Sequence, residues 1–339
     1  MTHLRLLPFI LLLAIPGLAR SQDAPVPGDG PRDVRLGLYV MDITEISDLD
    51  NTFRAELDFE NQWHDPARAW TPINGETDPR TFLNERALEE VAKGWGPNLG
   101  VVNTSGDLPW THLQLKIYSD GRAVLRGRIN GLFRSYLDFH RFPFDSQALV
   151  LNVESNIWDT RELDLAPNPD RTGISSEVYL AEWNVTGIET SVSVYENGRR
   201  GVIRDRLRVE IGIERKSRFY VLKIIAPLVA IVFITSVVFW MRGEDLGRRA
   251  GISSTGMLTV IAYQFIVSAF LPRVAYLTVM DKIVLLTFLF ISVTMLMNIL
   301  ASSGPFLASG RGERLDRVAR LVYPVSYVAG LALLAIRAL

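Results

Sequence analysis

The sequence predicts a membrane protein with an antiparallel β-sandwich followed by a four-helix transmembrane bundle. Three observations support this α and β multi-domain class. The first residues resemble an export signal, residues 22–217 carry most of the charge and tryptophan, and residues 218–339 are dominated by four apolar runs. A chain of 339 residues is long enough for about two domains.

Residues 1–21 have the features of a secretory signal peptide. His3 and Arg5 precede an apolar stretch from Leu6 to Leu18, and Ala19-Arg20-Ser21 fits a small-x-small cleavage site. The apolar stretch is too short to span a bilayer comfortably. We therefore expect cleavage near Ser21 and an exported domain that begins at residue 22.

Alternating apolar and polar residues predict the strands of a β-sandwich over residues 22–217. Ser119-Asp120-Gly121-Arg122 predicts one hairpin turn, and Asn197-Gly198 predicts another of the two-residue type. One helix is expected near Pro79–Lys93, with Asp78 as its cap. The expected strands lie in residues 34–43, 53–63, 113–117, 122–125, 147–155, 191–197 and 202–214.

Composition and motif content argue against an enzyme, a metal site, a cofactor site and a nucleic-acid partner. The chain has no cysteine, and its net charge of −1 offers no basic surface for nucleic acid. The four histidines are scattered, without the close pairs that metal sites use. No phosphate-cradling glycine loop and no spacing typical of a catalytic triad is present.

The second half, residues 218–339, contains four apolar segments of membrane-spanning length, at approximately 221–241, 250–271, 282–302 and 318–336. Arginines concentrate after the first segment and after the third. The positive-inside rule places both loops in the cytoplasm and the β-domain outside, as the signal peptide requires. The third and fourth spans lack a polar stripe and are expected to face lipid and neighbouring helices.

The second span carries a stripe of small or weakly polar residues that is interrupted by two large apolar ones. At helical spacing its members fall at alternating steps of four and three, which places them on one helix face. Several copies around an axis would form a pore with hydrophobic constrictions, whereas a monomer would use the stripe for close helix packing. The stripe consists of Gly251, Thr255, Leu258, Ala262, Phe265 and Ala269.

Three motifs, in this order along the chain, resemble those of the pentameric ligand-gated ion channel (Cys-loop receptor) family. Trp95–Asn98 resembles its Trp-x-Pro-Asp turn, Phe139–Gln147 its Phe-Pro-Phe-Asp loop, and Leu271–Lys282 the loop between its second and third spans. The cysteines of the eukaryotic signature loop would fall at Ser135 and Leu149. The chain is therefore similar to the bacterial branch that lacks them.

The resemblance implies a homopentamer, in which four further copies of the chain surround a central pore in a bacterial inner (cell) membrane. A small-molecule or ionic agonist would bind between neighbouring extracellular domains. Leu258 matches the family's central pore leucine, and a ring of such residues excludes water when it is narrow. Phe265 would form a second ring two turns above.

The resemblance directs the question of ion selectivity to the cytoplasmic end of the second span. Cation-conducting members usually carry a Glu before the basic residue that opens this span, whereas Arg248 precedes Arg249 here. A ring of arginines would concentrate anions. Glu244 and Asp245 lie just before and favour the alternative, a cation channel of the same family.

The family's ligand positions correspond here to residues that are not aromatic, so an amine held by cation–π contact is not expected. These positions fall near Asp58, Asn103 and Asn156. Glu154, Trp158 and Tyr195 lie nearby in sequence and are further candidates.

Proton gating is not transferred from the resemblance. The acidic sensor and the pore-helix histidine of the proton-gated bacterial member correspond to Asn51 and Val260.

The resemblance also implies a junction that couples the two domains. Asp48 and Arg215 match a family salt bridge, although as two surface charges they would contribute under about 1 kcal/mol. The other residues expected at this junction are Phe142, Pro143, Phe144, Asp145, Pro272, Arg273 and Tyr276.

Two rival functions remain open: a non-conducting, membrane-anchored periplasmic ligand sensor and a transporter. A lipid-facing anchor has no need of the Thr255, Leu258 and Phe265 stripe. A transporter would carry mid-membrane polar groups on several spans, whereas only the second span is rich in them.

Overall fold

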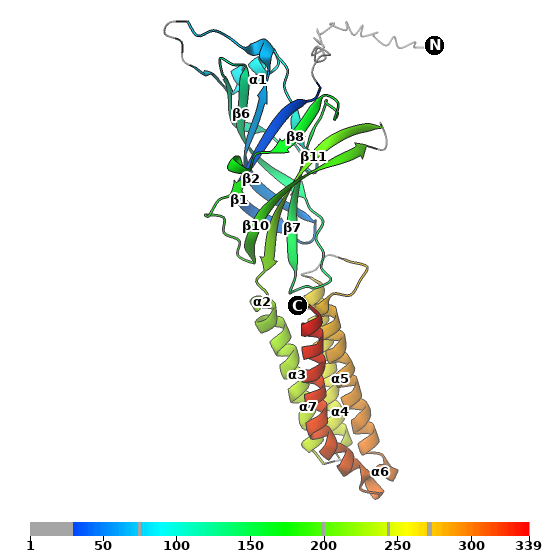
Figure 1. The fold of residues 1–339 in the computed structure, drawn as a ribbon. Helices are drawn as coiled ribbons and strands as arrows, with labels where there is room; N and C mark the ends of the chain where they lie inside the picture. Colours follow the sequence, from blue (N-terminus) through cyan, green and yellow to red (C-terminus); the bar gives the residue numbers. More distant parts are fainter. Residues whose placement is uncertain are drawn as a thin grey trace, which may run out of the picture.

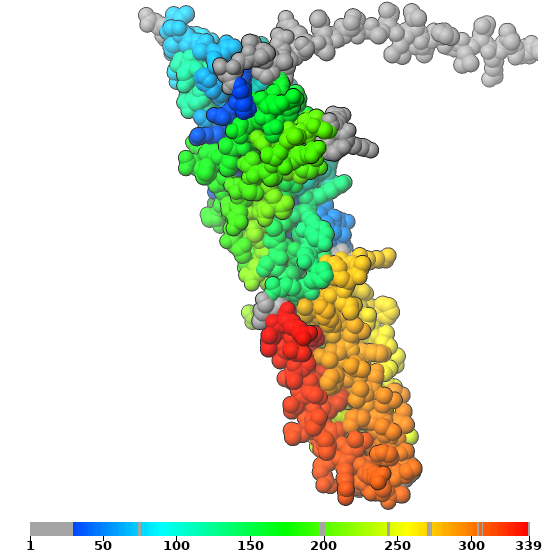
Figure 2. Space-filling model, turned by 45° about the vertical axis from the view of Figure 1, so that its right-hand side comes forward, coloured from blue at the N-terminus to red at the C-terminus, as the bar shows by residue number. Residues whose placement is uncertain are grey.

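A computed structural model describes residues 30–73, 76, 78–197, 201–242, 245–269 and 273–338. The β-strands form one end of an elongated subunit, and the four long helices form the other (Figures 1 and 2). The expected signal peptide, Glu244, Leu271 and Pro272 lie outside the described residues.

Two sheets form the sandwich, and their strands follow the predicted alternation. The first sheet has the order β3 (Arg80–Leu83), β5 (Trp110–Ile117), β6 (Arg122–Arg134), β2 (Thr52–His64), β1 (Arg32–Ser47) and β8 (Leu163–Pro167), with β9 (Gly173–Ile174) also on β1. The second has the order β10 (Trp183–Asn197), β11 (Val202–Arg215), β7 (Ser146–Ser155) and β4 (Leu99–Val101). Only β8 and β9 pair in parallel, so the predicted antiparallel sandwich is confirmed.

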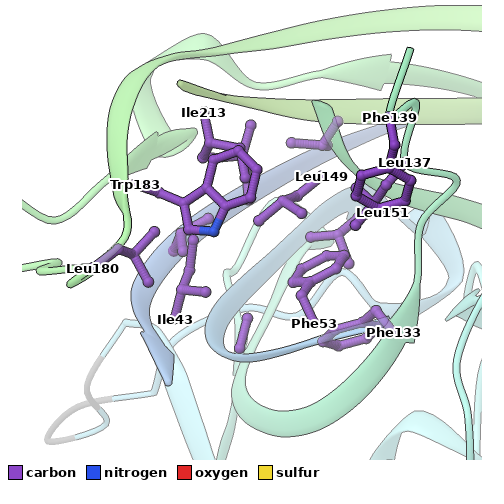
Figure 3. Packing of buried hydrophobic residues seen from close by; sticks show 14 of the residues in the cluster. Ile43, Phe53, Phe133, Leu137, Phe139, Leu149, Leu151, Leu180, Trp183 and Ile213 are labelled. Carbon is purple, nitrogen blue, oxygen red and sulfur yellow. The ribbon is translucent and has the colours of Figure 1, made fainter. Parts of the chain in front are cut away.

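The sandwich core forms where the inward faces of the two sheets meet. Every second residue of β2 from Phe53 to Trp63 is buried, and so is every second residue of β11 from Leu207 to Ile213. Figure 3 shows Trp183 and Ile213 on one side of this core and Phe53 and Phe133 on the other. Alternation puts these side chains on one face, where burial of apolar surface stabilises the fold.

Two local predictions about the sandwich were only partly right. The helix expected near Pro79–Lys93 is present but shorter, as α1 (Glu85–Val91), and the residues before it form the strand β3, which pairs with β5. Asp78 instead accepts hydrogen bonds from Ser119. The last hairpin pairs Asn197 with Val202, so four residues connect its strands rather than two. The remaining short helices of the domain are single 3₁₀ turns at Pro66–Arg68 and Pro169–Arg171.

Four helical segments are long and apolar enough to cross a membrane, as predicted. The first, Arg218–Trp240, comprises α2 (Arg218–Tyr220), a π-helical turn (Val221–Ile225), α3 (Ala226–Ser236) and a 3₁₀ turn (Val237–Trp240). The others are α4 (Leu246–Ser268), α5 (Val279–Ala301) and α7 (Arg311–Ala338), with the short α6 (Gly304–Ala308) before α7. The last helix starts earlier than expected because its arginine-rich turns continue the helix.

The helix α5 carries a buried polar face that its sequence did not reveal. Thr287, Thr294 and Asn298 have no exposed surface. Thr287 shares a hydrogen bond of 2.8 Å with the hydroxyl of Tyr327 on α7. The prediction that the third span lacks a polar stripe is therefore wrong, although this span does face neighbouring helices, because one side of α5 bonds to α4 and to α7.

Candidate channel site

The helix α4 has two faces with different environments in the subunit. Arg249, Ser253, Gly256, Val260 and Val267 are buried against the other helices. All six residues of the predicted stripe are exposed: Gly251, Thr255, Leu258, Ala262, Phe265 and Ala269. The side chains of the stripe are thus not buried by packing within this chain.

The stripe presents two large apolar side chains among small ones. Leu258 is 67% exposed and Phe265 is 72% exposed. The hydroxyl of Thr255 donates to the carbonyl of Gly251 at 2.9 Å, within its own helix. The donor of this hydroxyl is therefore already used within its own helix.

Arg249 lies inside the subunit, which contradicts the prediction that it lines the cytoplasmic mouth. Its guanidinium is fully buried and makes two bonds to Asp316 on α7, at 2.6 and 3.0 Å. Its Nε donates to Asn298 on α5 at 3.2 Å, and Asn298 donates to Ser253. This network was not predicted, because the charge of Asp316 stands among many arginines in the sequence.

The other predicted mouth residues differ from Arg249. Arg248 is exposed and lies three residues before Gly251, so it continues the exposed stripe. Asp245 is exposed at the N-cap of α4, where its carbonyl accepts the first backbone bonds of the helix. Arg248 is therefore the arginine of this pair that shares a face with Leu258.

Arg215 lies at the centre of a buried charge cluster between the sandwich and the helices. It ends β11, and its side chain makes two hydrogen bonds to Asp145, at 2.8 and 3.2 Å. Its Nη2 also lies 2.8 Å from Asp48, which follows β1. The predicted contact between Asp48 and Arg215 is thus present, and Asp145 is a second partner of Arg215 that was not predicted.

The environment of Arg215 favours its charged form. Its guanidinium stacks 4.0 Å from the ring of Trp183 and 4.9 Å from that of Phe142. Glu182 lies 4.0 Å away and is largely exposed. A buried cation needs several partners, because removal from water is costly. Asp48 after β1, Asp145 before β7 and Trp183 on β10 thus all contact Arg215, which lies just before the first span.

Asp48 is the carboxylate of this cluster whose pKa is shifted by its surroundings. Burial raises the pKa of Asp48 above its ordinary value of 3.8, although the charge of Arg215 opposes that shift. Its Oδ1 is buried without a hydrogen-bond partner. Protonation of Asp48 would remove one of the anions that face Arg215.

We expect Asp48→Asn to change how stability depends on pH. Because the pKa of Asp48 is raised, the folded protein binds this proton more tightly than the unfolded chain does. Stability from Asp48 therefore rises as pH falls toward 3.8, and it decreases as pH rises through the folded pKa. The difference in melting temperature between wild type and Asp48→Asn should change across this window.

Asp50→Asn is the matched control, because Asp50 is exposed and bonds only locally to Ser47. A melting-temperature difference between wild type and Asp48→Asn that stays constant with pH would contradict the assignment.

The Phe139–Gln147 loop contacts the helices directly. The backbone N–H of Phe139 donates to the hydroxyl of Tyr276 at 3.0 Å, and that of Met280 donates to the carbonyl of Phe142. The ring of His140 stacks on Tyr276 with a centroid distance of 3.6 Å. Pro143 is buried and Phe144 is half-buried, whereas Arg273 is exposed. The loop before α5 is therefore held by this sandwich loop.

Ser135 joins the two ends of the same loop without a disulfide. Its hydroxyl donates to the carbonyl of Ala148 at 2.9 Å and accepts from the N–H of Val150 at 3.1 Å. These two residues flank Leu149, the position matched to the second cysteine. Hydrogen bonds thus connect the chain at the two positions that the resemblance matches to the cysteines.

The ligand candidates fall into two groups on the sandwich. Glu154 on β7 and Tyr195 on β10 both contact Arg206 on β11. Glu154 forms an ion pair with Arg206, and the guanidinium of Arg206 lies 3.6 Å from the Tyr195 ring. Arg204 donates to the carbonyl of Asn156. Charged and aromatic groups from three strands therefore meet at one surface.

The other group of candidates is structural or lies elsewhere. Trp158 is buried, donates to the carbonyl of Gly96 at 2.7 Å and stacks on Trp95. Asn103 bonds only to backbone groups, including the carbonyl of Val150. These contacts give Trp158 and Asn103 a structural role in the sandwich that needs no ligand.

Asp58 lines a separate cleft on the first sheet, with a volume of about 830 Å³. It forms an ion pair with Arg128 at 2.8 Å, and Arg126 pairs with Glu60 in the same cleft. Asp58 and Glu154 thus lie on different sheets. Within the described residues, no group of three or more His, Asp or Glu is placed to hold a metal ion.

Comparison with known proteins agrees with this architecture. The neurotransmitter-gated ion-channel ligand binding domain family matches residues 20–217. A proton-gated ion channel of Gloeobacter violaceus is 24% identical over 96% of this chain and 89% of its own length. A glutamate-gated chloride channel of Drosophila melanogaster is 25% identical over 80% of this chain and 60% of its own length.

The γ-aminobutyric acid receptor subunit rho-3 of Homo sapiens is 24% identical over 78% of this chain and 56% of its own length. The chain thus spans little more than half of the length of the two animal relatives. The relatives are channels rather than enzymes, and among them are both a proton-gated and a chloride-conducting member. With the sandwich, the four spans and the absence of cysteine, these matches show that the chain belongs to the pentameric ligand-gated ion channel family, in the branch that lacks the signature cysteines.

Proposed function

We propose that the protein is a homopentameric ligand-gated ion channel of a bacterial inner membrane, with a pore lined by α4. The exposed stripe of α4 carries this proposal. Its six residues are unburied in the subunit, while the opposite face of the same helix is packed. Five such faces around an axis would place Leu258 and Phe265 as two apolar rings, the first as the gate.

The rival function of a non-conducting periplasmic sensor fits this helix less well. A helix that only anchors the protein would expose large apolar residues to lipid, as α5 does at Leu289 and Leu296. The stripe of α4 instead alternates Gly251, Thr255 and Ala262 with its two large residues. Small and hydroxyl-bearing residues suit a water-filled passage better than a lipid contact.

Anion selectivity is the favoured form of this proposal, and Arg248 supports it. Arg248 continues the stripe at the N-terminal end of α4, where the helix dipole is also positive. A ring of these side chains would raise the local concentration of anions. Asp245 and Glu244 would oppose this field, and the alternative remains a cation-selective channel.

Current through the reconstituted protein tests both the conduction and its sign. Under a tenfold chloride gradient, an anion channel reverses near the chloride potential, about 59 mV from zero. Arg248→Glu should move the reversal potential toward the cation value, because the field at the mouth changes sign. Arg248→Lys keeps the charge and should leave the reversal potential in place. A wild-type reversal near the cation potential would exclude anion selectivity.

The agonist site of this proposal lies between neighbouring sandwiches. One subunit would contribute Glu154, Tyr195 and Asn156, together with Arg206, and the next would contribute the Asp58 cleft. Both surfaces carry paired cations and anions, so the expected agonist is polar or charged. Binding would be transmitted through Arg215 and the Phe139–Gln147 loop to α4.

A further inference from the structure

His140 is the histidine through which the sandwich contacts the loop before α5. The other two histidines of the described residues lie elsewhere: His64 bonds to a carbonyl of the turn between β5 and β6, and His112 lines the Asp58 cleft. The ring of His140 lies flat on the ring of Tyr276, with a centroid distance of 3.6 Å and an angle of 6° between the two planes. A side chain that can carry a charge is thus a direct contact between the two domains.

Asp138 holds the edge of the same imidazole ring. Its carboxylate lies 2.6 Å from Nδ1 of His140 and accepts from the backbone N–H of that residue at 3.0 Å. The hydroxyl of Tyr276 lies 3.5 Å from the same carboxylate oxygen. Two hydrogen bonds between its own backbone and the side chain of Gln147 fix Asp138 in place. These three residues, His140, Asp138 and Tyr276, are the His140 clasp.

The two partners of His140 keep their charge states through the range in which a histidine ordinarily titrates, between about pH 5 and pH 8. The backbone and side-chain hydrogen bonds from His140 lower the pKa of Asp138 below its ordinary value of 3.8, so its carboxylate stays ionised. Burial raises the pKa of Tyr276 above its ordinary value of 10.0, so its hydroxyl stays neutral. A change of charge in the clasp over this range therefore belongs to the imidazole.

The segments packed against the clasp carry other ionisable groups, but none is of a type that ordinarily titrates in this range. Arginine is not deprotonated in proteins, and tyrosine, lysine and aspartate ordinarily titrate above or below it. Asp281 is bonded to Thr278 in the N-terminal cap of α5 rather than to His140. The groups on these segments are Tyr136, Arg141, Arg273, Asp281 and Lys282.

We propose that the His140 clasp is a pH-dependent contact that tightens as the pH of the outer solution falls. A protonated imidazole holds Asp138 through a charge-assisted hydrogen bond and attracts the face of the Tyr276 ring as a cation. A neutral imidazole keeps only the weaker hydrogen bond and the stacking. The loop before α5 is therefore held firmly in acid, and that hold is lost as the pH rises and the proton leaves.

This contact gives the protein a means of regulation by pH that is separate from the charge cluster of Arg215. The clasp joins the Phe139–Gln147 loop to the segment that connects α4 to α5. A tighter clasp favours whichever arrangement of the two segments contains it, because a contact present in one state shifts the equilibrium toward that state. This consequence for gating rests on the proposed channel function, whereas the contact itself does not.

Spin labelling of the full chain in detergent measures the clasp without an ion current. The chain has no cysteine, so Leu277→Cys provides a unique site for a nitroxide beside Tyr276. Leu277 is 53% exposed, which leaves room for the label. The ratio of immobile to mobile label should rise about fivefold between pH 8 and pH 5, as expected for the gain of one cation–π contact and one charge-assisted hydrogen bond.

Two substitutions of His140 bracket this response. His140→Phe keeps the stacking but never carries a charge, so the label should stay mobile at both pH values. His140→Arg is charged at both pH values and also stacks on aromatic rings, so the label should stay immobile throughout. Asp138→Asn removes the anion and should reduce the response. His64→Gln is the matched control, because His64 is an exposed histidine that bonds elsewhere in the sandwich, and it should keep the full response.

Two spin-label results would overturn the proposal. An equal response in wild type and His140→Phe would place the titrating group elsewhere, and its loss in Asp48→Asn would then assign it to the Arg215 cluster. Loss of the response in His64→Gln would show a general effect of charge on the sandwich.

The effect on gating is measured in Leu258→Thr, a variant that is expected to leak without agonist. The leak should differ between pH 8 and pH 5, and the addition of His140→Phe should remove the difference. A leak independent of pH, in a protein whose label responds, would contradict the regulatory role. Absence of any current would contradict the channel proposal and leave the result of the spin label in force.

Discussion

Asp316→Ala should destabilise the folded protein by about 3–5 kcal/mol, because it leaves the guanidinium of Arg249 buried without an anion. Arg249 is fully buried, and both of its terminal nitrogens bond to Asp316. Asn298 contacts only its Nε and cannot neutralise the charge. The loss should appear as a lower melting temperature and a smaller yield of assembled protein.

The double variant Arg249→Met with Asp316→Leu separates pairing from packing. Because it removes both charges and keeps apolar volume, its stability should return close to that of wild type. Asp316→Asn keeps an acceptor but not the charge and should fall between the two. A melting temperature for Asp316→Ala equal to that of wild type would contradict the assignment of Asp316 as the necessary counter-ion.

Leu258→Thr should open the resting channel and produce a leak current in the absence of agonist. The substitution replaces an apolar constriction by a hydroxyl-bearing side chain, which favours water in a narrow pore. We expect each of five copies to lose about 1 kcal/mol of the free energy that favours the dry, closed pore. Added together, these losses approach about 5.5 kcal/mol, which is the free energy that converts a 1:99 ratio of open to closed channels into 99:1. Single-channel recording in planar bilayers would measure the resting open probability.

Leu296→Thr is the control for this gate. Leu296 is exposed to a similar degree, but it lies on α5 rather than on the α4 stripe. It should leave the resting current unchanged, because its side chain is not part of the stripe that is proposed to line the pore. The Leu258→Thr channel could instead stay closed at rest and still conduct with agonist. That result would show that the gate lies elsewhere, and Phe265 would be the next position to change.

The main elements of the fold could be predicted because their patterns are local. Alternation along residues 207–213 placed four apolar side chains on one face of β11, and all four are buried. Four apolar runs predicted the four spans. The error at residues 80–83 has the opposite cause: β3 exists because it pairs with β5, and no local pattern reveals that partner.

The candidate site shows the same division. The spacing of Gly251, Thr255 and Leu258 was enough to identify the α4 stripe, because helical periodicity depends on one helix alone. The partners of Arg249 could not be found in this way, because Asn298 and Asp316 are separated from it by 49 and 67 residues. Arg248 and Arg249 are adjacent in the sequence, but Arg248 is exposed and Arg249 is buried. Only the packing of the helices decides this difference.

The sequence by itself determined the two-domain architecture, the helix that carries the stripe and the motifs at the junction between the two domains. Tertiary structure decided which charges are buried and which remain free. It took Arg249 into the bundle and left Arg248 on the exposed face, and it gave Arg215 a second partner in Asp145. The physical reason is that periodicity fixes which face a residue occupies, whereas the cost of burying a charge depends on what other elements bring to it.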